Sequence, residues 1–539
     1  MTADLRKTRR CFLTLAGGGI AGTLLGGFDT HGSTRPGSGQ YGQGQHRSAW
    51  PGSGQHEPGT NGSSVSATAS LPEQFDARIP QLMDRFDIPG VAVGLIEDGD
   101  VAWTNAYGYA DLDSGRRMTT DTVCRAESIT KSITAWGIMR LVEIGTVGLD
   151  DPVTDHVTSW ELPDAEFSWE EVTIRRLLSN TAGLPDGIYS NYSLDDPVPT
   201  LTGALDGDAG APAARPTDRP GSEFRYSNPG FVLLELVIED ATGRAYDEFI
   251  EAEVLEPLGM DGATFDVTAV PAERLATNYT RTGRAVSPYR EPARAHGMLL
   301  STIEAIASFV AASASGSEHT PLGGNVLGAD SVRTMHEPEI ETTGFYRHGS
   351  DSYGLGHMIE ELSNGERAVS HGGQGSGSWS WYHVVPETGD GIVVLTNTER
   401  SLRLIASILG DWTTATGLGS VSLSRTYTRV ETAIRAITGI IGVAALGLAG
   451  YSSIELRSGS RTISPLASES MRFRLAVLAI AVGVLGGWWI VAYPTVDLLV
   501  PGLADWLGGA VTLFACALGV LAITPRADPE PRSDLATDR

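Results

Sequence analysis

Cysteine and lysine are the residues that this chain has least of. Three cysteines lie in separate regions of its 539 residues: Cys11, Cys124 and Cys516. Such isolated positions support neither a disulfide framework nor a cysteine-based metal site. Only two lysines occur, Lys7 and Lys131, and all other strongly basic residues are arginines. Lys131 follows Ser128 by three residues, which suggests a role there that arginine cannot fill.

Positive charge as a whole is also scarce. The chain carries 39 basic against 65 acidic residues, a formal net charge of -26. This balance argues against nucleic acid as a partner, because phosphate binding needs clustered cations. Scarce lysine with abundant acid suggests a halophilic source, where concentrated salt screens the repulsion between surface carboxylates. A GC-rich genome, which favours arginine over lysine, is the alternative.

Both ends of the chain differ from its middle. Arg9 and Arg10 precede a short, glycine-rich apolar stretch, which predicts a twin-arginine export signal over residues 1–30. The alternative is a basic cluster before a buried helix. Residues 31–70 hold almost no large apolar side chains, so we expect a disordered Gly/Ser-rich tether.

Three apolar runs follow one another near the C-terminus, at residues 436–450, 475–493 and 507–524. Each approaches the roughly 20 residues needed to cross a bilayer. We therefore expect a linker over 418–435, three transmembrane helices within 436–525 that contact membrane lipid, and a charged cytoplasmic tail over 526–539.

The loops between these runs predict an orientation. Arginines gather between the first and second runs, whereas the next loop carries only acids. Loops rich in arginine and lysine tend to stay in the cytoplasm, which places the loop between the first and second runs there. The region before residue 436 should then lie outside the cell, where an export signal would send it. The prediction is a multi-pass protein of the cell membrane with its soluble domain on the extracellular face. Arg425, Arg429 and Arg435, just before the first run, weaken this argument slightly.

The middle region, residues 71–417, has the pattern of one soluble domain. Residues 90–110 alternate and turn at Asp98-Gly99-Asp100, which predicts a β-hairpin, and helical patterns dominate from residue 129 to about 254. Further strands occupy residues 353–397, and residues 401–415 predict a closing helix. This order predicts an α/β (α+β) domain, with an antiparallel sheet built from distant segments, flanking helices and a helical lobe.

Ser128 and Lys131 open the helical stretch "SITKSITAWGIMRLVEIG", so the two side chains share one helix face. A neutral amine beside the serine could take its proton, but free lysine, with a pKa near 10.4, is almost entirely charged at pH 7. The site must depress that pKa by burial or nearby positive charge, which is possible for lysine and not for arginine.

Two further motifs carry reactive or positioning groups. "YSN" places Tyr226 and Asn228 at the start of an apolar helix, where a phenol could relay protons and an amide could orient a substrate; a capping turn is the alternative. "HGG" places His371 at a strand end before two glycines that would let a ligand approach the backbone; an ordinary glycine-rich hairpin turn is the alternative.

Ser-x-x-Lys, Tyr-x-Asn and His-x-Gly, in this order, resemble the serine β-lactamase and penicillin-binding protein family, especially its class C-like branch with DD-carboxypeptidases and esterases. The resemblance covers about residues 71–416 and implies a β-lactamase-like fold. It implies that Ser128 is the acylated nucleophile, Lys131 its general base and Tyr226 the proton shuttle. Asn228 would hold the substrate amide, and the backbone N–H groups of Ser128 and Gln374 would form the oxyanion hole.

The third motif departs from the family pattern. His371 stands where β-lactamases often have lysine, and Gly372 replaces a hydroxyl residue that would bind a substrate carboxylate, leaving Gly373 as the glycine that matches the motif. A histidine is neutral near pH 7, so efficient β-lactam hydrolysis is not expected. Asn180 stands where many relatives have histidine, and we interpret it as structural.

These patterns predict an exported, membrane-anchored serine hydrolase that acts through an acyl-enzyme on an ester or amide of a small molecule or peptide. The alternatives are a non-catalytic or slowly turning over penicillin-receptor-like sensor and a true β-lactamase. The sequence predicts no cofactor and no metal, because it lacks a His-Glu-x-x-His motif. Substrate specificity would lie in loops such as residues 189–218, which have no readable code.

Overall fold

The computed structural model describes residues 70–314, 321–461, 471–493, 496–497, 500 and 502–524. The predicted signal segment 1–30, the tether up to residue 69 and the tail 526–539 lie outside the described residues.

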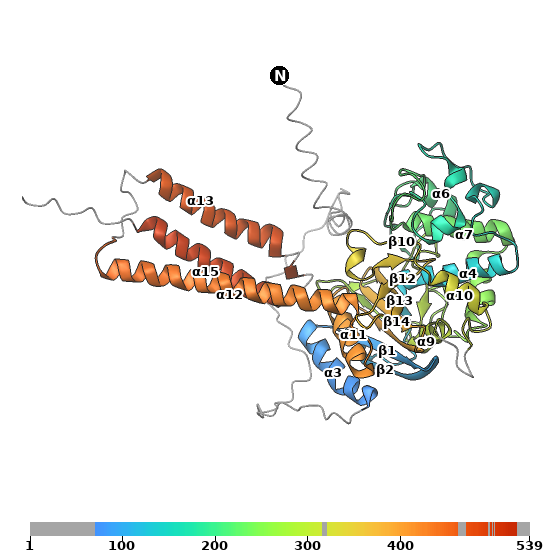
Figure 1. Ribbon diagram of the computed structural model, residues 1–539, viewed down its shortest axis with the longest axis horizontal. Coiled ribbons are helices and arrows are strands. Elements are labelled where there is room, and N and C mark those ends of the chain that lie inside the picture. Colours follow the sequence, from blue (N-terminus) through green and yellow to red (C-terminus); the bar gives the residue numbers. More distant parts are fainter. Residues whose placement is uncertain are drawn as a thin grey trace, which may run out of the picture.

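A nine-stranded antiparallel sheet forms the centre of the soluble domain (Figure 1). Its strands in spatial order are β10 (Ile340–Glu341), β11 (Ser352–Tyr353), β12 (Met358–Glu361), β13 (Arg367–Gly375), β14 (Ser378–Val385), β15 (Asp390–Thr396), β1 (Gly90–Glu97), β2 (Asp100–Asp111) and β3 (Arg116–Arg117). The first strands of the domain therefore pair with its last ones, which confirms the predicted sheet of distant segments.

The predicted hairpin is the pair β1 and β2. Asp98 and Gly99 make its two-residue turn with φ angles of 51° and 81°, the left-handed conformation that a type I′ turn requires. Side chains of β1 alternate between two cores: Val91, Val93 and Leu95 point to one, and Ala92 and Ile96 to the other. Helices cover both faces of the strand, which explains why its sequence is an almost continuous apolar run.

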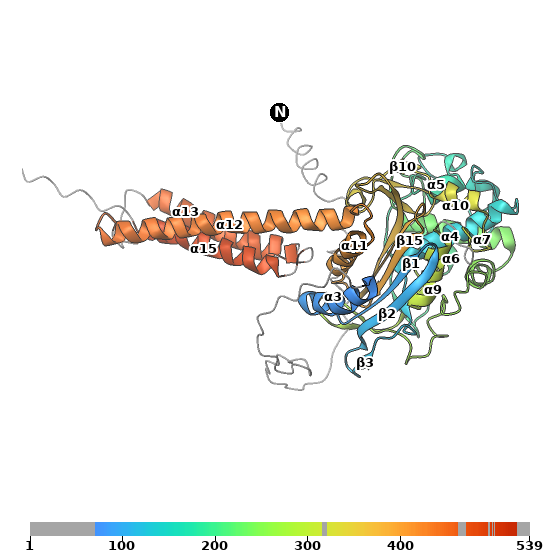
Figure 2. The same ribbon diagram turned by 60° about the horizontal axis from the view of Figure 1, so that its bottom comes forward.

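Helices lie on both sides of the sheet (Figure 2). On one side α3 (Leu71–Phe86) and α11 (Leu402–Thr416) pack on the core of β1, and α9 (Ile303–Ala312) packs on the other side. The helical lobe comprises α4 (Thr130–Glu143), α5 (Ile174–Leu178), α6 (Leu201–Asp206), α7 (Asn228–Thr242) and α8 (Tyr246–Ile250).

Short elements complete the domain. They are the strand pairs β4 (Cys124–Arg125) with β9 (Leu300–Ser301), β5 (Tyr192–Ser193) with β8 (Tyr289–Arg290), and β6 (Asn278–Tyr279) with β7 (Ala285–Val286), the helix α10 (Ala329–Met335), and the single turns η1 (Glu127–Ile129), η2 (Val153–Asp155), η3 (Trp169–Glu171), η4 (Glu251–Leu255) and η5 (Tyr346–His348).

Three C-terminal helices are long and apolar enough to cross a membrane. They are α12 (Ser422–Arg457), α13 (Met471–Gly487), which continues through the π-helical turn η6 (Trp488–Ala492), and α15 (Leu503–Ile523). Apolar side chains of α12 beyond residue 436 are exposed, among them Ile440 and Val443. The segment 418–435, expected as a linker, is helical from Ser422 on, so the same helix leaves the domain and enters the apolar run.

A buried polar network joins α12 to the sheet. The Trp381 indole N–H donates to Nδ1 of His383 at 2.8 Å, so Nε2 carries the proton, which it donates to Glu360 Oε1 at 2.7 Å. The other oxygen of Glu360 accepts the backbone N–H of Ser422, where α12 begins, at 2.6 Å. The Glu360 carboxylate thus caps α12, and the positive end of the helix dipole stabilises its negative charge. The start of α12 is fixed to strands β12 and β14.

Glu360→Ala should lower the free energy of unfolding by about 3 kcal/mol, because it leaves the Nε2–H of His383 and the Ser422 N–H buried without their acceptor. Denaturant titration of the detergent-solubilised chain, followed by tryptophan fluorescence, measures this change. Glu361→Ala is the matched control, since Glu361 is the exposed neighbour on the same strand. Equal destabilisation by both substitutions would contradict a structural role for the network.

Candidate active site

Ser128 lies in the turn η1, between strand β4 and helix α4. The preceding residue, Glu127, has a φ of 51°, a left-handed conformation that is strained for a side-chain-bearing residue. This reversal directs the chain from the strand into the helix, so that Ser128 sits half-buried above the first turn of α4. Lys131 lies one turn later, and its Nζ is 3.2 Å from the Ser128 Oγ.

Lys131 is fully buried. Its Nζ contacts three oxygens, the Ser128 Oγ, Asn228 Oδ1 at 2.7 Å and the His296 carbonyl at 2.5 Å. Burial lowers the pKa of Lys131 to about 7, although the charges of Asp186, Glu291 and Glu127 act in the opposite direction. Roughly half of the molecules therefore hold a neutral amine at pH 7. The depressed pKa that a lysine base requires is present.

Tyr226 stands beside this pair, from the loop before α7. Its phenol lies close enough to the Ser128 side chain to interact with it, and Lys131 Nζ lies 4.8 Å from the centre of its ring. The ring stacks on Tyr346 at 4.8 Å between centroids. Burial raises the pKa of Tyr226 well above the usual value, so the hydroxyl stays protonated and can donate a proton or hydrogen bond.

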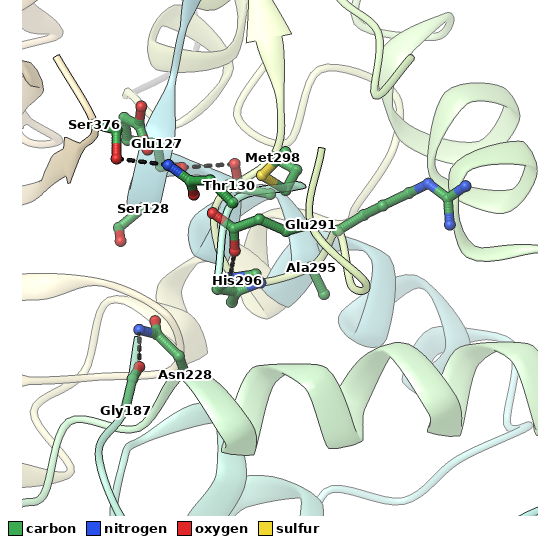
Figure 3. Close-up of polar contacts among 12 residues, drawn as sticks. Glu127, Ser128, Thr130, Gly187, Asn228, Glu291, Ala295, His296, Met298 and Ser376 are labelled. Atoms are coloured by element: carbon green, nitrogen blue, oxygen red, sulfur yellow. Dashed lines mark hydrogen bonds and ion pairs between the residues drawn. The ribbon is translucent and has the colours of Figure 1, made fainter. Parts of the chain in front are cut away.

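Asn228 is the first residue of α7 and is held at both ends of its amide. Its oxygen accepts from Lys131, and its nitrogen donates to the carbonyl of Gly187 at 2.6 Å (Figure 3). The start of α7 is fixed locally, because the Ser227 hydroxyl accepts the Gly230 N–H and Pro229 follows at once. Asn228 thus links Lys131 to the loop at Gly187. The same residue also lies in a helix-capping turn, the alternative interpretation of the "YSN" motif, so both interpretations apply.

Asn180 supports the same loop from below. It is buried with a φ of 56°, and its Oδ1 accepts the Ser227 N–H at 2.9 Å. The side chain contacts the segment that carries Tyr226 and Asn228, which agrees with its structural interpretation.

Strand β13 brings the third motif beside the serine turn. A Cβ at Gly373 would lie 2.7 Å from the Ala126 carbonyl and 2.3 Å from the Ser380 hydroxyl, so only glycine lets the strand and the turn approach this closely. Gln374 follows at an exposed position of the same strand. Gly373 is therefore needed for packing whatever the ligand.

The His371 side chain does not reach the surface. It is fully buried, its Nε2 lies 3.0 Å from the Tyr353 hydroxyl, and its Nδ1 lies 2.8 Å from the Gly372 carbonyl. Since a carbonyl only accepts, Nδ1 carries the proton and Nε2 accepts from the tyrosine. Burial lowers the pKa of His371 to about 3. The histidine is therefore neutral and buried below the site, and its side chain has no exposed surface that a substrate could contact.

Carboxyl groups that the motifs did not indicate surround the lysine. Glu127 is buried and accepts from the Ser378 hydroxyl at 2.6 Å, and burial raises its pKa to about 7. Oε2 of Glu291 accepts a hydrogen bond from the ring nitrogen Nε2 of His296 at 2.8 Å (Figure 3). Adjacency to Ser128 could have drawn attention to Glu127. Asp186 and Glu291 had no such signal, because only the fold brings them near Lys131.

Metal ligands are not assembled in the described part of the chain, where no group of three or more His, Cys, Asp or Glu side chains could hold an ion.

Comparison with known proteins identifies the family. The profile of the family described as Beta-lactamase matches residues 75–407, more than half of the chain. The chain belongs to the beta-lactamase family. Its membership confirms the resemblance drawn from the three motifs and the β-lactamase-like fold expected from it.

Individual members of this family share about a third or less of their residues with this chain over the matched regions. Protein flp of Staphylococcus aureus strain MW2 is 30% identical over 214 residues, which cover 39% of this chain and 42% of the relative. Esterase EstB of Burkholderia gladioli is 33% identical over 219 residues, which cover 39% of this chain and 55% of the relative. The matched region thus spans about half or less of these curated relatives. The penicillin-binding protein homologue from Pyrococcus abyssi is 27% identical with a TM-score of 0.52, covering 63% of this chain and 78% of that one.

The two lysines allow a direct test of the lysine pKa. With 13C-labelled lysine, NMR should show Lys131 titrating near pH 7, whereas free lysine, measured as the reference, titrates at about pH 10.4. Asp186→Asn should lower the pKa of Lys131 further, because it removes a negative charge that stabilises the ammonium. Asp195→Asn, a control at an exposed position nearby, should leave it unchanged. Titration of Lys131 together with free lysine would refute a depressed pKa.

Proposed function

We propose that this protein is a serine hydrolase that forms an acyl-enzyme on Ser128. The observation that carries the proposal is the contact of the Ser128 Oγ with a fully buried lysine whose pKa is about 7. Membership of the beta-lactamase family and the order of the three motifs support it. A non-catalytic binding module would have no use for an amine tuned to be half neutral at pH 7.

The geometry supports one sequence of proton transfers. Neutral Lys131 takes the proton of Ser128 while the serine oxygen attacks the carbonyl carbon of the ester or amide. The oxyanion would be stabilised by the backbone N–H groups of Ser128 and Gln374. Tyr226, protonated and beside Ser128, gives its proton to the leaving group and recovers one through Lys131. A water molecule activated by the same pair then releases the acyl group.

The electrostatics of the site favour substrates without a negative charge at the recognised end. Three carboxyl groups, Asp186, Glu291 and Glu127, act on Lys131, and His371 is neutral and buried. A substrate carboxylate would meet repulsion and no exposed histidine cation. We therefore infer that neutral esters and amides are preferred over β-lactams and over peptides with a free terminal carboxylate.

Export and membrane anchoring complete the proposal. Arg9 and Arg10 support a twin-arginine signal, and the arginine-rich loop between the first two apolar helices supports a cytoplasmic position for that loop. The hydrolase domain would then face the outside of the cell, anchored by α12, α13 and α15.

Mass spectrometry of the intact chain after exposure to chromogenic esters, amides and fluorophosphonates tests the acyl-enzyme. We expect an adduct on Ser128 that is absent in Ser128→Ala. Lys131→Arg should slow acylation by about 1000-fold, because arginine stays protonated. Arg333→Lys, an exchange of the same two residue types at an exposed position of α10, is the control and should have no effect. A stable adduct without turnover would indicate a sensor, and no adduct from any reagent on folded protein would refute the serine hydrolase.

A matched pair of substrates tests the charge preference. Two phenyl esters with the same acyl group, one with a carboxamide and the other with a carboxylate on the phenyl ring, differ only in that group, and kcat/KM should be about 10-fold or more higher for the neutral one, a difference of about 1.4 kcal/mol. Added salt should narrow the ratio, because it screens the repulsion. A higher kcat/KM for the carboxylate would contradict the preference and favour a true β-lactamase or carboxypeptidase.

A further inference from the structure

A cavity of about 210 Å³ lies at the junction of the soluble domain with the first apolar helix. Its walls come from α3, α11 and the first turns of α12, three helices that Figures 1 and 2 both place together at the domain end of α12. Four arginines line it: Arg78 and Arg85 from α3, Arg403 from α11 and Arg435 from α12. Such a cluster stands out in a chain with a net charge of -26.

The acidic residues around this cavity do not balance its arginines. Glu431 lies within ion-pair distance of both Arg403 and Arg435, and Asp411 pairs with Arg78. Among the described residues, Arg85 has no carboxylate within 4.0 Å, and its side chain is exposed. Four guanidinium groups therefore share two carboxylates. Burial is the largest cause that lowers the pKa of Arg403, and the positive charges of Arg85 and Arg435 lower it further. A bound anion would relieve the repulsion among these three arginines.

The cavity lies beside the point where the exposed surface of α12 changes from polar to apolar. On α12, apolar side chains become widely exposed directly after Arg435, as at Ile437 and Ile440. Ile434 packs against Trp488 at the end of α13 and Leu507 on α15. Trp506 on α15 is 74% exposed. Tryptophan side chains at helix ends mark the interface between hydrocarbon and headgroups. The arginines thus stand just outside the apolar part of the three helices.

We propose that this cavity binds the phosphate of an anionic phospholipid headgroup. A guanidinium group donates two parallel hydrogen bonds to a phosphate, and Arg85, Arg403 and Arg435 surround one space from three helices. Hydroxyl groups of Ser407, Thr428 and Thr432 line the same space, but each donates to a backbone carbonyl of its own helix, so the guanidinium groups are the donors to a headgroup. The inference rests on the proposed membrane insertion of α12, and it gives a role to Arg435, the last arginine before the first apolar run.

The test compares the full chain in nanodiscs of phosphatidylcholine alone and with added phosphatidylglycerol. The melting temperature should rise by about 2 °C or more with the anionic lipid, because the ligand binds the folded state. Native mass spectrometry should show phosphatidylglycerol retained on the protein. Arg85→Gln should abolish the shift and reduce retention at least tenfold. Arg429→Gln, a control at an exposed position of α12 outside the cavity, should keep both.

Other outcomes would overturn the proposal in distinguishable ways. Equal losses in Arg85→Gln and Arg429→Gln would show a diffuse surface attraction in place of a site. The same shift with inorganic phosphate in detergent would identify a soluble anion as the ligand. Release of the chain from cell membranes by alkaline carbonate would contradict both the proposed membrane anchoring and the proposed lipid site. None of these results bears on acylation of Ser128, which is measured separately.

Discussion

Removal of the Lys131 amine from water is the constraint on which the candidate site depends. In water the amine would be charged and could not accept the proton of Ser128. The walls around it include the rings of Tyr226 and Phe231, 4.8 and 5.4 Å from Nζ. Burial alone would lower the pKa further, and the nearby carboxyl groups offset part of the effect. The resulting pKa near 7 is a balance of desolvation against attraction, and it allows both charge states.

Distant parts of the chain must be in place for this balance to exist. The three acceptors of Lys131 belong to the start of α4, to the start of α7 and to the segment before β9, where His296 lies. Lys131 and Asn228 are 97 positions apart, and Lys131 and His296 are 165 apart. The pKa is therefore a property of the folded domain, and an unfolded or partly folded chain would carry an ordinary ammonium at the same position.

The sequence predicted what short segments encode and missed what only the fold assembles. Alternation and the Asp-Gly turn predicted the β1–β2 hairpin, and apolar length predicted the three C-terminal helices. The spacing of Ser128 and Lys131 predicted their contact, since it depends on one helical turn. Burial of His371 could not be predicted, because it follows from Tyr353 and from strands that pair over long distances. The helical start of α12 at Ser422 was missed for the same reason, since Glu360 caps it.

The join between α12 and the sheet bears on how anchoring affects the site. Glu360 holds the first turn of α12 and the ring of His383, which accepts from Trp381. The Trp381 ring packs over Gly372 so closely that a Cβ there would lie 2.3 Å from it. Gly372 belongs to β13, the strand that runs beside Ser128. A continuous helix and a packed network, with no flexible linker between them, connect the apolar segment to the active-site strand. In the proposed membrane-anchored protein, the anchor therefore fixes the orientation of the site as well as its location.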